Sequence, residues 1–349
     1  RLAASAAKDL TKEENLYEFQ NFLKETNSYV FTINGFPYGN FHGKPVKEGA
    51  YKPDWSDDLR LNYTNLLADH LSKLLPDGIE GSISTVPGTY KPWSQGNDGD
   101  KLVNKIIINI LKHIAHLIKI KRSTGKEISL SLEPEPYCFL ETISETITFF
   151  QNRLFSKESV DFLSKLINLN AVDTEKNLRF HLGICYDVCH AAVEFEDPKK
   201  SITDIQNSGI RITKLQLSSA IKIAKVNKNT YETLKSLDEP VYMHQVVEKT
   251  GSVLKRFPDL SDAFKQIENS FGSEWRIHFH VPIFLKKMDN FDTTQDFLKD
   301  ILRIHKQNPI SQHLEVETYT WDVLPSQYKN TPVNKAIARE LNWVIGELS

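Results

Sequence analysis

The sequence predicts an α/β fold in which eight parallel strands close into a (β/α)8 barrel with helices outside it. Strand-like and helix-like segments alternate along the whole chain, an order typical of βα units and a parallel sheet. One such barrel commonly has about 250 residues, and more with insertions. The 349 residues therefore suit a single domain spanning 1–349, and no linker divides them. The strand-like segments are 29–35, 81–87, 127–133, 179–187, 212–218, 275–282 and 314–321.

The number of strand-like segments is one short of a complete barrel. The chain begins at Arg1 without a methionine, and a polar helical stretch follows soon after it. We therefore expect the first strand or two of the barrel to lie upstream of this numbering.

The segment 128–133 shows most clearly why these stretches are predicted to be strands. Its isoleucine and leucines share one register, and Ser129, Ser131 and Glu133 share the other. Side chains in a strand alternate between the two faces of a sheet. Because 179–187 and 212–218 repeat this alternation, the polar registers must face something that these strands share.

Apolar residues spaced i, i+3, i+4 and i+7 predict helices between the strands. The predicted helices lie near 16–23, 63–74, 103–117, 143–154, 160–167 and 297–304, with a last helix opened by Thr331 and Pro332. Two insertions interrupt this order. Residues 34–56 are rich in Gly, Pro and aromatics and form a candidate lid, because loops after barrel strands build the active face. Residues 219–270 are predicted to be largely helical.

The composition excludes several classes of function. The chain has 43 basic and 45 acidic residues, a formal net charge of −2 that would not attract nucleic acid or an anionic membrane. It has no apolar run of the roughly 20 residues needed to cross a bilayer, and no signal segment. The three cysteines are too few for a disulfide framework and are expected to be reduced. We expect a soluble, cytoplasmic protein.

Five strand-like segments end, on the polar register, in a residue suited to binding a metal or moving a proton. Because carboxylates, imidazoles and amide oxygens are metal ligands, their recurrence predicts a divalent-metal site at one mouth of the barrel. The predicted ligands are Glu133, Asp187, Gln216, His280 and Glu317.

The segment 183–191 carries the sharpest local signal. Asp187 ends a strand and His190 follows three residues later, so that a turn could make them neighbouring ligands. The same spacing is also typical of an aspartate that caps a helix beside a surface histidine. Cys185 and Cys189 flank Asp187, but without a second cysteine pair a thiolate zinc site is disfavoured relative to buried structural thiols.

The 187–190 segment resembles the DxxH motif of the xylose isomerase-like TIM barrels, which include sugar isomerases, keto-sugar epimerases and endonuclease IV-type repair enzymes. The resemblance implies a metal held by a Glu, an Asp, a His and a second Glu from successive strands. Glu133, Asp187 and Glu317 match the carboxylates in order. Gln216 stands where the histidine is expected, and His280 or His278 could compensate.

A closer resemblance covers nearly the whole chain. It rests on the segments 32–42, 81–88, 131–136, 278–282 and 315–321, which are similar to the bacterial EboE family of metabolite traffic proteins. The resemblance implies a xylose isomerase-like TIM barrel. The metal that an isomerase or epimerase would use is predicted to be Mn²⁺, Mg²⁺ or Zn²⁺. It also implies gene clusters for secondary-metabolite trafficking and a prenyltransferase-like membrane protein as a partner.

Further residues are predicted to lie around the metal or to bind substrate. Glu135 could instead form a salt bridge at the barrel rim, Glu315 could pair with an arginine, and Trp321 could pack on the rim. Residues 34–56 mix hydrogen-bonding groups with aromatic faces, which suits a polar small molecule. The full set is Asn34, Tyr38, His42, Glu135, His190, His278, Glu315, Tyr319 and Trp321, with Lys47 and Tyr51 in the same loop as the first three.

Three functions are compatible with these residues. The first is a metal-dependent isomerase or epimerase of a sugar-like or hydroxy-carbonyl molecule, with Glu133 and Glu317 as the catalytic carboxylates that move a proton. The second is a non-catalytic protein that binds a metabolite and hands it over, which the neutral Gln216 favours. The third, an abasic-site endonuclease, needs more histidines and a basic groove for phosphates, and no nucleic acid is expected as a partner.

Overall fold

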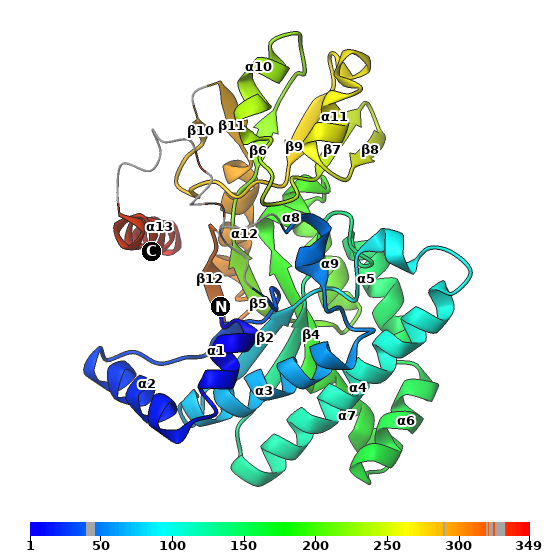
Figure 1. Cartoon of the computed structure of the whole chain (residues 1–349), viewed down its shortest axis with the longest axis vertical. Coiled ribbons are helices and arrows are strands. Elements are labelled where there is room, and N and C mark those ends of the chain that lie inside the picture. Colours follow the sequence, from blue (N-terminus) through cyan, green and yellow to red (C-terminus); the bar gives the residue numbers. More distant parts are fainter. Residues whose placement is uncertain (40–45, 289, 319, 321–323, 325–331) are drawn as a thin grey trace.

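The computed structural model describes residues 1–39, 46–288, 290–318, 320, 324 and 332–349 (Figure 1). One of its two sheets has six parallel strands in the order β1-β2-β3-β4-β5-β12. They are β1 (Thr32–Asn34), β2 (Gly81–Thr85), β3 (Ile128–Leu132), β4 (Leu182–Asp187), β5 (Arg211–Leu217) and β12 (Leu314–Val316). The sheet curls into a half-barrel flanked by helices, which is compatible with a TIM-like fold. Within the described residues β1 and β12 stay unpaired edges, so the predicted closed eight-stranded barrel is not formed there.

The predicted helices are present at the expected places. Several begin at a side-chain cap: Asp57 accepts a hydrogen bond from the Leu59 N–H, and Thr142 forms a capping box with Glu145. The last helix begins after Pro332, and its predicted cap Thr331 lies outside the described residues. The helices are α1 (Ala4–Asp9), α2 (Glu13–Glu25), α3 (Asp58–Leu74), α4 (Gly99–Thr124), α5 (Ile143–Phe149), α6 (Lys157–Ile167), α7 (Ala171–His181), α8 (Val188–Val193), α9 (Pro198–Asn207), α12 (Gln295–Gln307) and α13 (Val333–Leu348), with a π-helical turn at Phe150–Leu154 and 3-10 turns at Lys47–Tyr51 and Lys91–Ser94.

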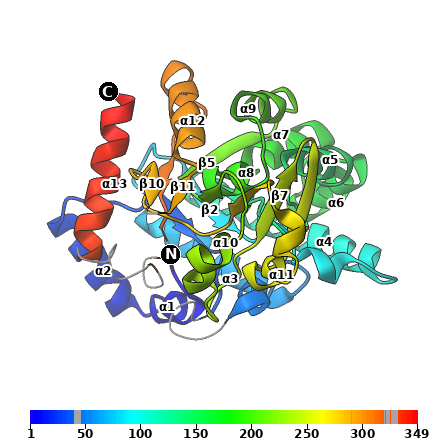
Figure 2. The same cartoon turned by 90° about the horizontal axis from the view of Figure 1, so that it is seen from above.

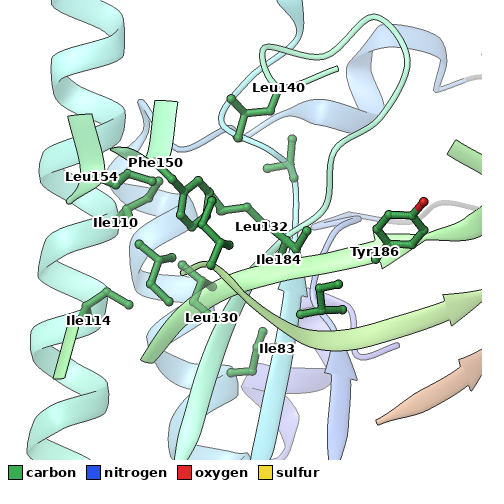
Figure 3. Packing of buried hydrophobic residues seen from close by; sticks show 14 of the residues in the cluster. Ile83, Ile110, Ile114, Leu130, Leu132, Leu140, Phe150, Leu154, Ile184 and Tyr186 are labelled. Atoms are coloured by element: carbon green, nitrogen blue, oxygen red, sulfur yellow. The ribbon is translucent and has the colours of Figure 1, made fainter. Parts of the chain in front are cut away.

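The apolar register of the curled sheet packs outward against helices, as the alternation predicts. Strand residues and helix residues interleave in one buried core, and each isoleucine or leucine buried in this way contributes about 1.5–3 kcal/mol. Figure 3 shows this packing for Ile83, Ile110, Ile114, Leu130, Leu132, Phe150, Leu154 and Ile184.

The polar register points into the curve of the sheet, where hydrogen bonds and ion pairs replace apolar packing. Near the amino ends of the strands, Arg211 Nη2 lies 2.6 and 2.8 Å from the two carboxylate oxygens of Glu80. One layer higher, the hydroxyls of Ser131 and Thr213 are 2.6 Å apart. These polar layers lead upward to the carboxyl ends of the strands, where the predicted site residues lie.

Between β5 and β12 the chain forms a second, antiparallel sheet of six strands, in the order β10-β11-β6-β9-β7-β8. It has its own buried cluster and lies beyond the carboxyl ends of the parallel strands, so that Figure 2 looks down onto it. Its elements are β6 (Ile221–Ile223), α10 (Thr230–Leu234), a 3-10 turn (Lys235–Leu237), β7 (Val246–Thr250), β8 (Val253–Phe257), α11 (Leu260–Phe264), a 3-10 turn (Ile267–Ser270), β9 (Glu274–Ile277), β10 (Lys287–Met288) and β11 (Phe291–Thr293).

This sheet corrects two predictions. Residues 219–270 are not largely helical, and 275–282 is not a barrel strand, because β9 pairs antiparallel with β6 and β7. In β9, Trp275 and Ile277 are buried while Glu274 and Arg276 are half-buried. Any two-faced strand shows this period, whatever strand it pairs with, so the pattern predicts a strand without identifying its sheet.

A third correction concerns the segment 179–187. Helix α7 continues through His181, and β4 begins at Leu182. The His181 ring is buried and its Nδ1 lies 2.6 Å from the Ile128 carbonyl oxygen. The alternation of Phe180, Leu182 and Ile184 therefore runs across a helix end and is strand-like in its second half only.

Among the described residues, no helix combines the length and the apolar character that crossing a bilayer requires.

Candidate metal centre

The carboxyl ends of the parallel strands bring three predicted ligands together. Glu133 directly follows β3, Asp187 ends β4, and Glu317 directly follows β12. One oxygen from each carboxylate lies within 4.8 Å of the others, so the three could hold a metal ion. Glu133 and Asp187 are buried, and the Glu317 side chain is 21% exposed.

Two side-chain amides hold the carboxylates of Glu133 and Glu317 in position. Asn34 Nδ2, at the end of β1, donates to Glu317 Oε1 at 2.9 Å. Gln216 Nε2 donates to Glu133 Oε1 at 3.3 Å and also to Glu317 Oε2. The Gln216 oxygen accepts a hydrogen bond from Cys185 Sγ at 3.7 Å. In this orientation Gln216 turns its nitrogen, which cannot bind a metal, toward the carboxylates, and its predicted role as a ligand stays a prediction.

Asp187 caps a helix, which is one of the two roles that the sequence left open, and keeps one oxygen that could bind a metal. Its Oδ1 caps α8 by accepting the His190 N–H at 3.0 Å, and it also accepts the Ser218 hydroxyl at 2.7 Å. Its Oδ2 is buried and has no hydrogen-bond partner among the described residues, and the same holds for Glu133 Oε2. A buried acceptor without a partner costs about 1–3 kcal/mol, so both atoms are suited to accept a cation.

Three buried histidines surround the carboxylates. His190 belongs to α8, whereas His278 and His280 follow β9 of the second sheet. The ring centroids of His190 and His278 are 4.5 Å apart, and those of His278 and His280 are 5.4 Å apart. The insertion thus carries two imidazoles to the mouth of the half-barrel, where they form further candidate groups: Asp187 with His190 and His280, Glu135 with His190 and His278, and Cys189 with His278 and His280.

Burial shifts the pKa values of three of the glutamates and two of the histidines at the site toward their neutral forms. Burial, and next the neighbouring carboxylates, raise the pKa of Glu133 well above its usual value. Burial raises the pKa of Glu317 and raises that of Glu135 to about 8. Burial lowers the pKa of His190 to about 4 and also lowers that of His278. A divalent cation would offset the repulsion among the acids and bind the neutral imidazoles.

A cavity of about 270 Å³ opens beside these residues. Its wall combines apolar and aromatic groups with the candidate ligands, as small-molecule sites commonly do. Tyr51, from the predicted lid segment, donates its hydroxyl to Glu135 Oε1 at 2.9 Å. The lining includes Asn34, Phe36, Lys47, Tyr51, Glu133, Glu135, His190, Tyr242, Met243, His278 and Glu317.

The remaining predicted residues have different positions. Glu135 is buried at the cavity rather than paired at the rim, and Glu315 pairs with Lys214 rather than with an arginine. The Tyr38 ring contacts Tyr63 of α3, with centroids 5.1 Å apart, and is not among the cavity-lining residues that the structure describes. His42, Tyr319 and Trp321 lie outside the described residues.

Two residues of the site were missed by the sequence analysis. Lys214 shares the inward register of Gln216, and a lysine two residues before a predicted ligand in the same strand was a usable signal. Gln245 binds His278 Nδ1 through its Oε1 at 2.7 Å and Tyr51 OH through its Nε2 at 2.8 Å. Nothing in the local sequence marks Gln245, because its neighbours in space come from distant segments.

Replacing Gln216 with histidine is expected to strengthen metal binding about tenfold, the scale typical of changes next to a metal ligand. The change removes an N–H donor from between Glu133 and Glu317 and supplies a ring nitrogen with a lone pair. Calorimetric titration with Mn²⁺ or Zn²⁺ would measure it. An unchanged affinity would place residue 216 outside the ligand set.

Neither a scan of the chain against protein-family models nor a search of curated proteins finds a match.

Proposed function

We propose that the protein binds a divalent metal ion through Glu133, Asp187 and Glu317 and acts on a sugar-like or hydroxy-carbonyl molecule as an isomerase or epimerase. One observation carries this proposal. Three carboxylates from distant segments meet in a buried place, and two of their oxygens, Glu133 Oε2 and Asp187 Oδ2, have no hydrogen-bond partner among the described residues. An arrangement of this kind is costly to the fold unless a cation occupies it.

The residues around the cavity suit this chemistry. A bound divalent ion would polarise a carbonyl group and make the neighbouring C–H more acidic. Glu133 and Glu317 lie on either side of the Gln216 amide, and both line the cavity, where each could take or return a proton. Raised pKa values bring both carboxyls closer to neutral pH, where a group that moves protons works best.

The volume and lining of the cavity fit a small polar substrate. About 270 Å³ is near the lower end of ligand-pocket sizes. Phe36 and Tyr51 provide ring faces, and Asn34 and the carboxylates provide hydrogen bonds. An abasic-site endonuclease is less well supported, because this small cavity sets three glutamates against Arg1 and Lys47 and does not form the basic groove that a phosphate backbone requires.

A second function, metabolite binding and hand-over without turnover, is favoured by the orientation of Gln216. Its nitrogen bridges Glu133 and Glu317 and ties the two carboxylates together without any metal. The half-barrel supports the further proposal that the chain is a xylose isomerase-like TIM barrel of the EboE type. In that case its partners would be a small metabolite and a prenyltransferase-like membrane protein.

Metal uptake tests the proposed site. Chelator-treated protein dialysed against Mn²⁺ or Zn²⁺ is expected to retain stoichiometric metal by elemental analysis. Glu133→Gln combined with Glu317→Gln is expected to lose the ion bound there, because amides replace two anionic ligands. Glu158→Gln is a matched control, since Glu158 is exposed on α6. Unchanged metal content in the double variant would remove the assignment.

Proton exchange separates the two functions. The metal-loaded protein is incubated in D₂O with a panel of ketoses and aldoses and followed by proton NMR. An isomerase or epimerase is expected to exchange the proton on the carbon next to the carbonyl, and Glu133→Gln to abolish that exchange. Ligand binding without exchange, seen as chemical-shift changes alone, would support hand-over.

A further inference from the structure

The tautomers of His190 and His278 can be assigned from their hydrogen bonds. His190 Nδ1 lies 2.9 Å from the carbonyl oxygen of Pro134, which only accepts, so this Nδ1 carries a proton. His278 Nδ1 lies 2.7 Å from Gln245 Oε1. The Gln245 amide is oriented by its Nε2, which donates to the Pro136 carbonyl oxygen at 3.2 Å. His278 Nδ1 therefore carries a proton as well.

It follows that the two neutral rings aim lone pairs at each other. A neutral imidazole has one N–H, so both Nε2 atoms are unprotonated, and they are 3.0 Å apart. Both rings are buried, His190 with 6% and His278 with 3% of its surface exposed. Two facing lone pairs in a buried place repel each other unless a proton or a metal ion lies between them.

A metal ion satisfies this pair better than a proton does. A shared proton would place an imidazolium charge in a buried position beside a third imidazole, His280, whose ring centroid lies 5.8 Å from that of His190. Two nitrogens bound to one tetrahedral zinc, each at about 2.0–2.1 Å, are about 3.3 Å apart. The observed separation of 3.0 Å is close to that value.

We propose that His190 and His278 bind a second divalent cation through their Nε2 atoms, with the Glu135 carboxylate as the third ligand. A ligand atom of each of the three residues lies within 4.8 Å of the others, and all three line the cavity. Two imidazoles and one carboxylate favour Zn²⁺ or another late first-row ion over Mg²⁺. This inference goes beyond the proposed function, which needs only the carboxylate site.

The second site adjoins the first. Asp187 Oδ2 lies 4.0 Å from His190 Nε2, so Asp187 faces both groups of ligands. Two divalent cations would match the four carboxylates Glu133, Glu135, Asp187 and Glu317 in charge. Two cations beside one cavity are suited to a ligand with two neighbouring oxygen donors, such as the hydroxy-carbonyl group considered above.

In both rings the Nδ1–H group is hydrogen-bonded and Nε2 is left to bind the metal, which fixes the orientation of the rings. The Pro134 carbonyl and Gln245 hold the two Nδ1–H groups, which fixes both rings and directs each Nε2 toward the other ring. Partners of this kind commonly orient histidine ligands and raise their basicity. Tyr51 OH contacts both Gln245 and Glu135, so the predicted lid segment supports two of the three ligand groups.

Zinc stoichiometry tests the second site. Wild-type protein is expected to bind two equivalents of Zn²⁺ by calorimetric titration and elemental analysis after gel filtration. His278→Gln and Glu135→Gln are each expected to bind one equivalent, and His116→Gln, a partly exposed histidine on α4, two. Glu133→Gln with Glu317→Gln should also bind one equivalent, held by the histidines.

The outcomes separate the two sites. One equivalent in wild-type protein and no loss in His278→Gln would overturn the second site, because the pair would then share a proton. Two equivalents kept by the Glu133 and Glu317 double variant would overturn the carboxylate site alone. Nitrogen-15 NMR of the wild-type histidines needs no substitution. Zn²⁺ should shift the Nε2 signals of His190 and His278, and unshifted signals would contradict the inference.

Discussion

Replacing Glu315 with glutamine is expected to lower the free energy of unfolding by about 3 kcal/mol, within the range typical of breaking a buried ion pair. Glu315 forms an ion pair with Lys214, whose side chain is completely buried inside the half-barrel. The glutamine amide oxygen and the Ser84 hydroxyl, at 3.2 Å, could still accept from the ammonium group, but neither carries the negative charge that the buried cation loses.

The reciprocal change should cost less. Lys214→Met removes the buried charge, and the Glu315 side chain that remains is 30% exposed and can be partly hydrated, although its Oε2 is buried. We expect a loss of about 1 kcal/mol, with the exposed partner discounted for screening by solvent. The double variant should resemble Lys214→Met alone, because no buried ammonium group is left without its partner.

Urea unfolding of the three variants, followed by circular dichroism, would measure these differences. Because Lys214 is more deeply buried than Glu315, we predict that Glu315→Gln lowers the free energy of unfolding more than Lys214→Met does. A larger loss for Lys214→Met than for Glu315→Gln would show that Lys214 stabilises chiefly the acidic cluster above it. Glu315 was predicted to lie beside the metal. Its ion pair with the buried Lys214 places it instead in the polar layer beneath the candidate metal centre.

Removing metal is expected to destabilise the protein more as the pH rises. Burial raises the pKa of Glu135 to about 8 and also raises those of Glu133 and Glu317. A carboxyl group whose folded-state pKa lies above its unfolded value contributes stability that is fully present below the unfolded pKa. That contribution is lost as the pH rises through the folded-state pKa. For Glu135 the window lies between about pH 4.5 and pH 8.

Metal-free protein should therefore lose stability across this window, by on the order of 5 kcal/mol for Glu135 alone. Metal-loaded protein should lose less, because ligands bind metal in their ionised form and binding releases protons. Thermal unfolding with EDTA or with Zn²⁺, at several pH values between 5.5 and 8.5, would measure the difference.

Glu135→Gln provides the control, because glutamine does not titrate in this window. Its metal-free form should show a weaker dependence of stability on pH than the metal-free wild type. If EDTA and Zn²⁺ gave parallel curves, metal binding would not depend on ionisation of these carboxylates. A cation would then not be needed to offset the repulsion among these ionised carboxylates.

Much of the curled sheet could be predicted because its signals are local. In β3, which is buried on both faces, the apolar and polar faces follow directly from the alternating residues, since Leu130 packs toward α4 while Ser131 faces Thr213. The position of Glu133 and Asp187 at strand ends follows from the same alternation. Parallel strands place their carboxyl ends at one edge, so the meeting of these residues with Glu317 could be expected from the amino-acid sequence.

The second sheet could not be predicted, because a period of two identifies a strand but not its neighbours. Residues 275–282 have the alternation of a barrel strand, yet β9 pairs antiparallel with β6 and β7. The orientation of the Gln216 amide could not be predicted from the sequence either. It depends on Glu133, Glu317 and Cys185, which come from three other segments of the chain.

By itself the sequence determined the parallel α/β sheet, its outward apolar face and the acidic residues at its carboxyl ends, because backbone geometry links each of these to neighbouring residues. Only the tertiary structure decided that an inserted antiparallel sheet brings His278 and His280 to those acids, and that His190 and His278 face each other through unprotonated nitrogens. Such contacts join residues far apart in the chain, and their geometry depends on packing that no local pattern records.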